Sequence, residues 1–133
     1  MKRSAANPLI ILVDESEAAT VFDSVESAEA HMEAIDVEDG IYSVYDSVGR
    51  ELLVRALPDG NARIGDGTGR VDAQAARAAL TRTAEWVGLE KVRLSEEDLT
   101  ALPLPDLAAR IREHDRTMTW LSRVRRRIPF LVP

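Results

Sequence analysis

The chain of 133 residues contains no cysteine and only two histidines, His31 and His114. Without cysteine, the chain has no disulfide, no thiolate-ligated zinc site and no cysteine nucleophile. Two histidines are too few for a histidine-rich metal site. We therefore expect no bound metal and no cofactor.

Aromatic residues make up 5% of the chain, and no Gly-x-Ser-x-Gly turn accompanies the histidines. A glycosidase-like carboxylate pair needs one carboxyl group in an apolar pocket, usually beside aromatic residues that hold the substrate. The glycine-rich segment 65–69 lacks both the Lys-Ser/Thr ending of a phosphate-binding loop and the Gly-x-Gly-x-x-Gly spacing of a dinucleotide site. We expect that segment to be a flexible connector and the protein to have no catalytic residues. A small enzyme remains one alternative function, and a deep pocket that contains two carboxylates would favour it.

Long apolar runs are also lacking. The run at 9–13 has five residues, whereas the core of a signal peptide has roughly 7–15. No stretch approaches the roughly 20 apolar residues that cross a bilayer. We expect a cytoplasmic protein without a membrane span, and we interpret residues 9–13 as a buried strand.

Basic residues are absent from Ser4 to Gly49, although this segment holds eleven acidic residues. Residues 1–66 carry 14 acidic and 5 basic side chains, a net charge of −9, and residues 67–133 carry 9 acidic and 12 basic ones, a net charge of +3. Such separation steers association with oppositely charged partners, although an acidic surface can also serve solubility alone. Duplex-binding domains normally have a pI above about 9. Since the pI of this chain is about 4.9, we expect a basic protein partner rather than nucleic acid.

The first half of the chain is predicted to form a sheet that carries one helix. Asp23 is expected to cap a helix over 24–34, with Glu26 completing a capping box, and a turn follows at 36–40. Alternation along the strand 41–45 puts Tyr45 on one face and Tyr42 on the other. The expected strands are 9–13, 20–22, 41–45, 51–57 and 62–64.

The second half is predicted to be helical. Asp72 caps a helix that ends at Gly88, Ser95 begins a short helix, and a helix of about 36 Å runs over 105–128 at 1.5 Å per residue. This last helix either kinks near Arg116 or projects its Arg-rich end beyond the core. The predicted fold class is α+β: an antiparallel sheet of three to five strands with one packed helix, followed by a mainly helical C-terminal half. We expect one domain over 1–133, with a sheet-rich acidic half at 1–64 and a helical half at 70–128.

Residues 24–52 combine an acidic helix, an Ile-Asp-Val turn at 35–37 and the start of a hairpin with the pattern Tyr-x-x-Tyr-Asp at 42–46. This segment resembles small acidic bacterial immunity-type proteins that are encoded beside polymorphic or contact-delivered toxins. The resemblance covers about 30 of 133 residues. It implies an immunity protein, an antitoxin without catalytic activity that binds a cognate toxin and blocks its active site. It does not imply which toxin.

The outward face of the acidic helix, the turn after it and the hairpin tyrosines form the candidate partner-binding surface. A row of carboxylates could enter a basic cleft of a toxin as a mimic of phosphates, and a tyrosine would be an aromatic anchor. The candidate residues are Glu26, Glu29, Glu33, Asp36, Glu38, Asp39, Tyr42 and Tyr45. Reversal of Glu29, Glu33 and Asp36 to lysine is expected to leave the fold intact.

An alternative function is a structural or regulatory adaptor, or a homodimer, that pairs through the long C-terminal helix. Apolar residues keep a near-heptad spacing along that helix, which is typical of helix pairing. In that case its apolar positions would be incompletely covered in the monomer; they include Leu107, Ile111, Met118 and Leu121.

Overall fold

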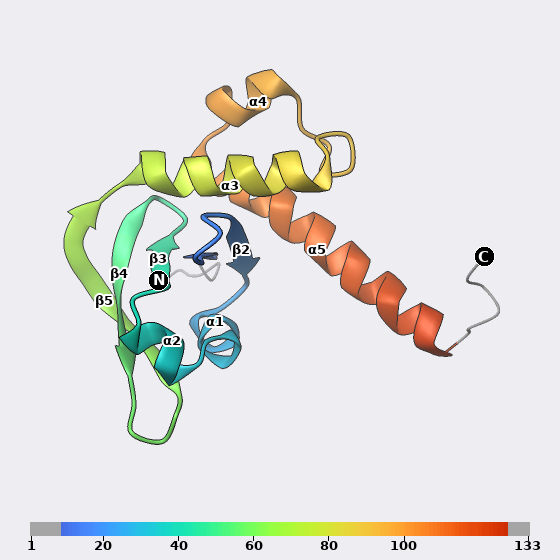
Figure 1. Ribbon diagram of the computed structural model, residues 1–133. Coiled ribbons are helices and arrows are strands. Elements are labelled where there is room, and N and C mark those ends of the chain that lie inside the picture. Colours follow the sequence, from blue (N-terminus) through green and yellow to red (C-terminus); the bar gives the residue numbers. More distant parts are fainter. Residues whose placement is uncertain (1–8, 128–133) are drawn as a thin grey trace, which may run out of the picture.

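A computed structural model describes the backbone of residues 9–127 and the side chains of residues 9–118. Within this range the chain has an α+β fold with five α-helices and one five-stranded antiparallel sheet of order β2-β1-β3-β4-β5 (Figure 1). The strands are β1 (Ile10–Val13), β2 (Ala19–Phe22), β3 (Ser43–Asp46), β4 (Arg50–Ala56) and β5 (Ala62–Val71). The helices are α1 (Val25–His31), α2 (Ala34–Glu38), α3 (Ala73–Val87), α4 (Glu96–Ala101) and α5 (Leu104–Arg127).

The sheet is covered on both faces, and β1 lies at its centre. Ile11 pairs with Val21 on β2 and with Tyr45 on β3, and these three side chains share one core cluster with residues of α3 and α5. Ile10 and Leu12, which alternate with Ile11, pack in a second cluster with Ala28 of α1. A strand that is buried on both faces needs apolar residues at every position. This explains why the sequence of β1 is a continuous apolar run.

Helix α3 lies across one end of the sheet. In the view of Figure 1, α5 begins behind α3 and then extends away from the sheet. The Thr83 hydroxyl of α3 accepts a hydrogen bond from the Ala19 N–H at 2.8 Å. The same hydroxyl donates a hydrogen bond to the Ala19 carbonyl oxygen, also at 2.8 Å. Ala19 belongs to β2, an edge strand, so this hydroxyl supplies hydrogen bonds that no neighbouring strand provides. The pairing of β2 with β1 confirms the predicted strand at 20–22 and extends it by one residue, to Ala19.

The acidic helix differs from its prediction at both ends. Its N-cap is Ser24, whose hydroxyl accepts the Ser27 N–H at 3.1 Å, and not Asp23. The helix ends at His31, because the next two residues are extended and the Ala34 N–H donates to the Gly60 carbonyl at 3.1 Å. A second short helix, α2, then occupies most of the predicted turn, so the sheet-rich half carries two helices instead of one.

The glycine-rich segment 65–69 is not a connector, as we expected it to be, but part of β5. The β4–β5 pairing continues to Arg50 and Val71 through two register shifts. Gly69 has a φ of 91°, and the Thr68 hydroxyl donates to the Glu51 carboxylate at 3.0 Å across the two strands. Glycine tolerates both the irregular backbone and the close approach of strands at bulges. The sheet-rich half therefore ends at Val71 rather than at residue 64.

The helical half follows its prediction closely. The Asp72 carboxylate accepts the Ala75 N–H at the start of α3, Gly88 follows its end with a φ of 109°, and Ser95 with Asp98 forms a capping box on α4. Residues 89–93 form a turn between α3 and α4. Helix α5 is uninterrupted and projects from the body of the protein (Figure 1). The predicted end of this helix at residue 128 lies outside the described residues.

Candidate partner-binding surface

Helices α1 and α2 are attached to the β4–β5 hairpin by two hydrogen bonds. One is the bond from the Ala34 N–H to the Gly60 carbonyl, and the other runs from the Ile64 N–H to Glu29 Oε2 at 2.7 Å. Ala28 and Met32 of this segment are 0% and 4% exposed. The acidic segment is therefore a fixed part of the fold, and its outward side chains have defined positions.

The six carboxylates predicted for partner binding fall into two groups. Glu26, Glu33, Glu38 and Asp39 are exposed, whereas Glu29 and Asp36 are half-buried. Among the side chains of residues 9–118, no lysine or arginine forms an ion pair with any of the six. The four exposed carboxylates are called the acidic surface below.

The two half-buried carboxylates have partners within the chain. Glu29 accepts the Ile64 N–H, and Asp36 lies 3.4 Å from the Tyr42 hydroxyl, which donates to it. Both groups are thus occupied by the fold itself. We therefore no longer expect reversal of Glu29 and Asp36 to leave the fold undisturbed.

Tyr42 lies beside the acidic surface in a region of negative charge. Burial raises the pKa of its hydroxyl, and the neighbouring carboxylates of Asp36, Glu33 and Asp14 raise it further. Each of these charges disfavours the phenolate and favours a cation nearby. Tyr42 is thus the aromatic side chain that fits the predicted role of an anchor.

Tyr45, the other predicted anchor, points into the core. It is 7% exposed and packs in the cluster formed with α3 and α5, and burial raises the pKa of its hydroxyl. Tyr42 directly precedes β3 and packs against the cluster that contains Ala28 of α1, whereas Tyr45 belongs to the other cluster, so only one of the two tyrosines can accompany the acidic helix. The prediction that Tyr45 is available as a surface anchor is wrong.

Ile35 is an apolar part of this surface that the sequence analysis missed. It is 64% exposed at the start of α2. The extended residues Met32 and Glu33 change the helical register, which turns Ile35 outward between the carboxylates of α2. An exposed isoleucine among charges is the composition of an interface centre with a polar rim.

A small cavity of about 210 Å³ lies next to Tyr42 and is lined by residues of α2, β3, β4 and β5. Val37 of α2 and Leu53 of β4 form two of its walls, and Leu53 is 50% exposed. Its lining mixes apolar side chains with the carboxylate of Glu51 and the hydroxyl of Thr68. No signal in the sequence marks it, because it brings together residues of α2, β3, β4 and β5.

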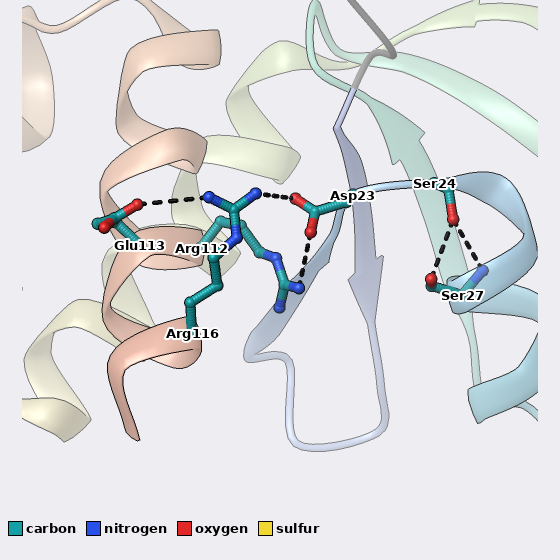
Figure 2. A network of polar contacts seen from close by, with 6 residues as sticks. All are labelled: Asp23, Ser24, Ser27, Arg112, Glu113 and Arg116. Atoms are coloured by element: carbon teal, nitrogen blue, oxygen red, sulfur yellow. Dashed lines mark hydrogen bonds and ion pairs between the residues drawn. The ribbon is translucent and has the colours of Figure 1, made fainter. Parts of the chain in front are cut away.

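Asp23 of the acidic half forms ion pairs with two arginines of the basic half of the chain. Its carboxylate binds Arg112 at 2.8 Å and Arg116 at 2.7 Å, both on α5, next to the Ser24 cap (Figure 2). The hydrogen bond from Arg112 is the largest cause of the lowered pKa of Asp23. These two arginines are paired with Asp23 and so do not neutralise the acidic surface.

Over residues 9–118 no three histidine or carboxylate side chains are grouped so that they could hold a metal ion. None of the helices within residues 9–127 is both long and apolar enough to span a bilayer. Comparison of the chain with protein-family models, with curated proteins and with solved structures found no match.

Proposed function

We propose that this protein is an immunity protein, which binds a cognate bacterial toxin and blocks a basic active site without catalysis. The observation that carries the proposal is the acidic surface itself. Glu26, Glu33, Glu38 and Asp39 are exposed on two short helices that the sheet holds in place, and within residues 9–118 they have no cationic partner.

Charge and apolar contact have different parts in this proposal. The carboxylates attract a basic protein over a distance and occupy the positions of substrate phosphates, which raises the association rate at low salt. Ile35 and Tyr42 then make the close contacts that slow dissociation. A cytosolic location, which we also propose, would place the protein where an incoming toxin acts.

The test is capture of the partner from the native host. The tagged chain is purified at 150 mM and at 500 mM salt, and any stoichiometric protein is identified and expressed alone and together with this chain. We expect a basic protein that stops growth when alone and is harmless in the presence of this chain. Capture of a partner without toxicity, or toxicity that this chain does not relieve, would overturn the proposal.

A second candidate function is an adaptor or homodimer that pairs through α5. Leu107 and Ile111 are covered, at 0% and 1% exposed, but Met118 further along α5 is 46% exposed. Among the described positions of the near-heptad row, Met118 is thus the one left exposed for pairing; Leu121 lies outside the described side chains. Sedimentation velocity of the wild type and Met118→Glu tests it, since a dimer that the substitution dissociates supports pairing and a monomeric wild type excludes the homodimer.

A further inference from the structure

A groove of about 490 Å³ lies between the turn after α3 and the middle of α5. It is separate from the acidic surface, since none of its residues belongs to α1, α2 or the β3–β4 hairpin. The residues that line it are Lys91, Val92, Arg93, Arg110, Glu113, His114 and Thr117.

The turn holds two cations at the mouth of this groove. Val92 and Leu94 are buried, at 3% and 6% exposed, so Lys91 and Arg93, which alternate with them, are exposed. Arg93 has a left-handed backbone with a φ of 57°, and its N–H donates to the Glu90 carbonyl at 3.2 Å. Residues other than glycine rarely adopt this conformation, which is enriched at binding sites.

Helix α5 contributes the third cation. Arg110 donates from Nη1 to the carbonyl oxygen of Arg93, which ties the turn to the helix and brings Arg110 beside it. His114 and Thr117 follow along the same side of α5 and add a ring nitrogen and a hydroxyl to the groove. The cationic side chains thus come from two elements that a hydrogen bond holds together.

The fold offsets only part of the positive charge of the groove. Among the described side chains Lys91, Arg93 and Arg110 form no ion pair, and Glu113, the carboxylate that lines the groove, lies 3.5 Å from Arg116. The charge of Arg110 contributes to the lowered pKa of Asp98 on α4, after the hydrogen bonds from Ser95, so Lys91 and Arg93 are the cations without a carboxylate partner. Unpaired cations that converge on a concave site are the usual means of binding a phosphate group. The volume also lies within the range of roughly 300–1,000 Å³ that is typical of small-molecule sites.

We infer that this groove binds the phosphate group of a small phosphorylated molecule between Lys91, Arg93 and Arg110. An extended nucleic-acid backbone fits less well, because it would pass Glu113 and approach a chain whose net charge is −6. The inference does not depend on the proposed toxin, since the groove and the acidic surface share no residue.

The experiment is a titration of the ¹⁵N-labelled full chain with pyrophosphate and with ADP at 150 mM salt, followed by amide chemical shifts. We expect saturable shifts confined to the turn and to the facing part of α5, near residues 91–93 and 110–117. Lys91→Gln with Arg93→Gln should weaken binding at least tenfold. The matched control is Arg55→Gln with Arg82→Gln, which removes two exposed arginines outside the groove and should change binding less than twofold. Tighter binding of ADP than of pyrophosphate would identify the source as a nucleotide rather than a free phosphate.

Four results would overturn the inference. Shifts that rise linearly without saturation, or that spread over the whole surface, would show nonspecific screening. Equal weakening by the groove and control variants would show that net charge alone is responsible. A short single-stranded oligonucleotide that binds these amides more tightly than either small ligand would assign the groove to nucleic acid. Concentration-dependent shifts at the same amides without ligand would assign it to the acidic surface of a second copy.

Discussion

The Glu29 carboxylate accepts a 2.7 Å hydrogen bond from the backbone N–H of Ile64, 35 positions further along the chain. Ile64 belongs to β5, the last strand of the sheet order, so this N–H lies on an edge strand. Unpaired backbone groups on edge strands invite pairing with other chains. Glu29 therefore has a structural function, in that it attaches α1 to the sheet and occupies a donor of its open edge.

Glu29→Ala should lower the free energy of unfolding by about 1–2 kcal/mol, because it leaves a part-buried N–H without an acceptor and removes a charged acceptor. Glu29→Gln keeps a carbonyl oxygen at the same place and should cost less than half as much. Urea denaturation of the three proteins measures the difference. If alanine and glutamine cost the same, the hydrogen bond does not contribute to stability.

Gly49→Ala should be among the most destabilising substitutions in the chain. Gly49 has a φ of 91°, and a Cβ there would lie 2.7 Å from the Cα of Ala73 at the start of α3. The expected loss is about 3 kcal/mol or more, since a clash with backbone adds to the roughly 1–2 kcal/mol of the left-handed conformation. Gly60→Ala is the control: its φ is 92° but a Cβ meets nothing within 4 Å. Thermal unfolding of both variants separates the two costs, and equal losses would contradict the close approach.

The ion pairs of Asp23 predict a specific pH dependence of stability. The pKa of Asp23 is lowered from 3.8 in the folded protein, by the hydrogen bond from Arg112 before all other causes. A carboxyl group whose pKa is lower in the folded state stabilises the protein above its unfolded pKa, and this contribution disappears as the pH falls through the folded pKa. The difference in unfolding free energy between the wild type and Asp23→Asn should therefore be about 1 kcal/mol near neutral pH and shrink towards zero below about pH 3.

The contribution of Asp115 to the free energy of unfolding has the opposite pH dependence, because burial raises the pKa of its carboxyl group. Its stabilising contribution is present below the unfolded pKa and is lost as the pH rises through the folded one. Both proteins in the comparison contain Asp115, so the part of its effect that does not act through Arg112 cancels in the difference. A difference that stays constant from about pH 7 to pH 3 would mean that Asp23 is not ion-paired in solution.

The sequence patterns correctly predicted those parts of the fold that depend on residues close together in the sequence. The caps at Asp72 and Ser95, the stop at Gly88 and the hairpin before β4 were all recognised from neighbouring residues. The early end of α1 was not recognised, because it depends on the carbonyl of Gly60. The strand through residues 65–69 was missed for the same reason, since its glycines are held by pairing with β4 and have little strand preference of their own.

In the candidate partner-binding surface, too, features set by neighbouring residues could be predicted and features set by distant residues could not. The row of acidic residues is visible in the sequence, but their partners are not: Glu29 is engaged by a residue of β5 and Asp36 by Tyr42. The burial of Tyr45 could have been inferred from alternation alone, once Tyr42 was placed beside the acidic helix. The exposure of Ile35 could not, because it follows from two extended residues inside a pattern that is helical in its spacing.

The most direct test of the acidic surface is the salt dependence of the association rate with the captured partner. Glu33→Lys with Glu38→Lys reverses two exposed carboxylates that form no hydrogen bond through their side chains within the described residues, and Glu85→Lys with Glu90→Lys makes the same change of charge outside the acidic surface. We expect the first variant to associate at least tenfold more slowly than the wild type at low salt, with a smaller gap at 500 mM, and the control to stay within about threefold. Equal rates for the two variants at low salt would contradict the account, because the acidic surface would then have no special part in binding.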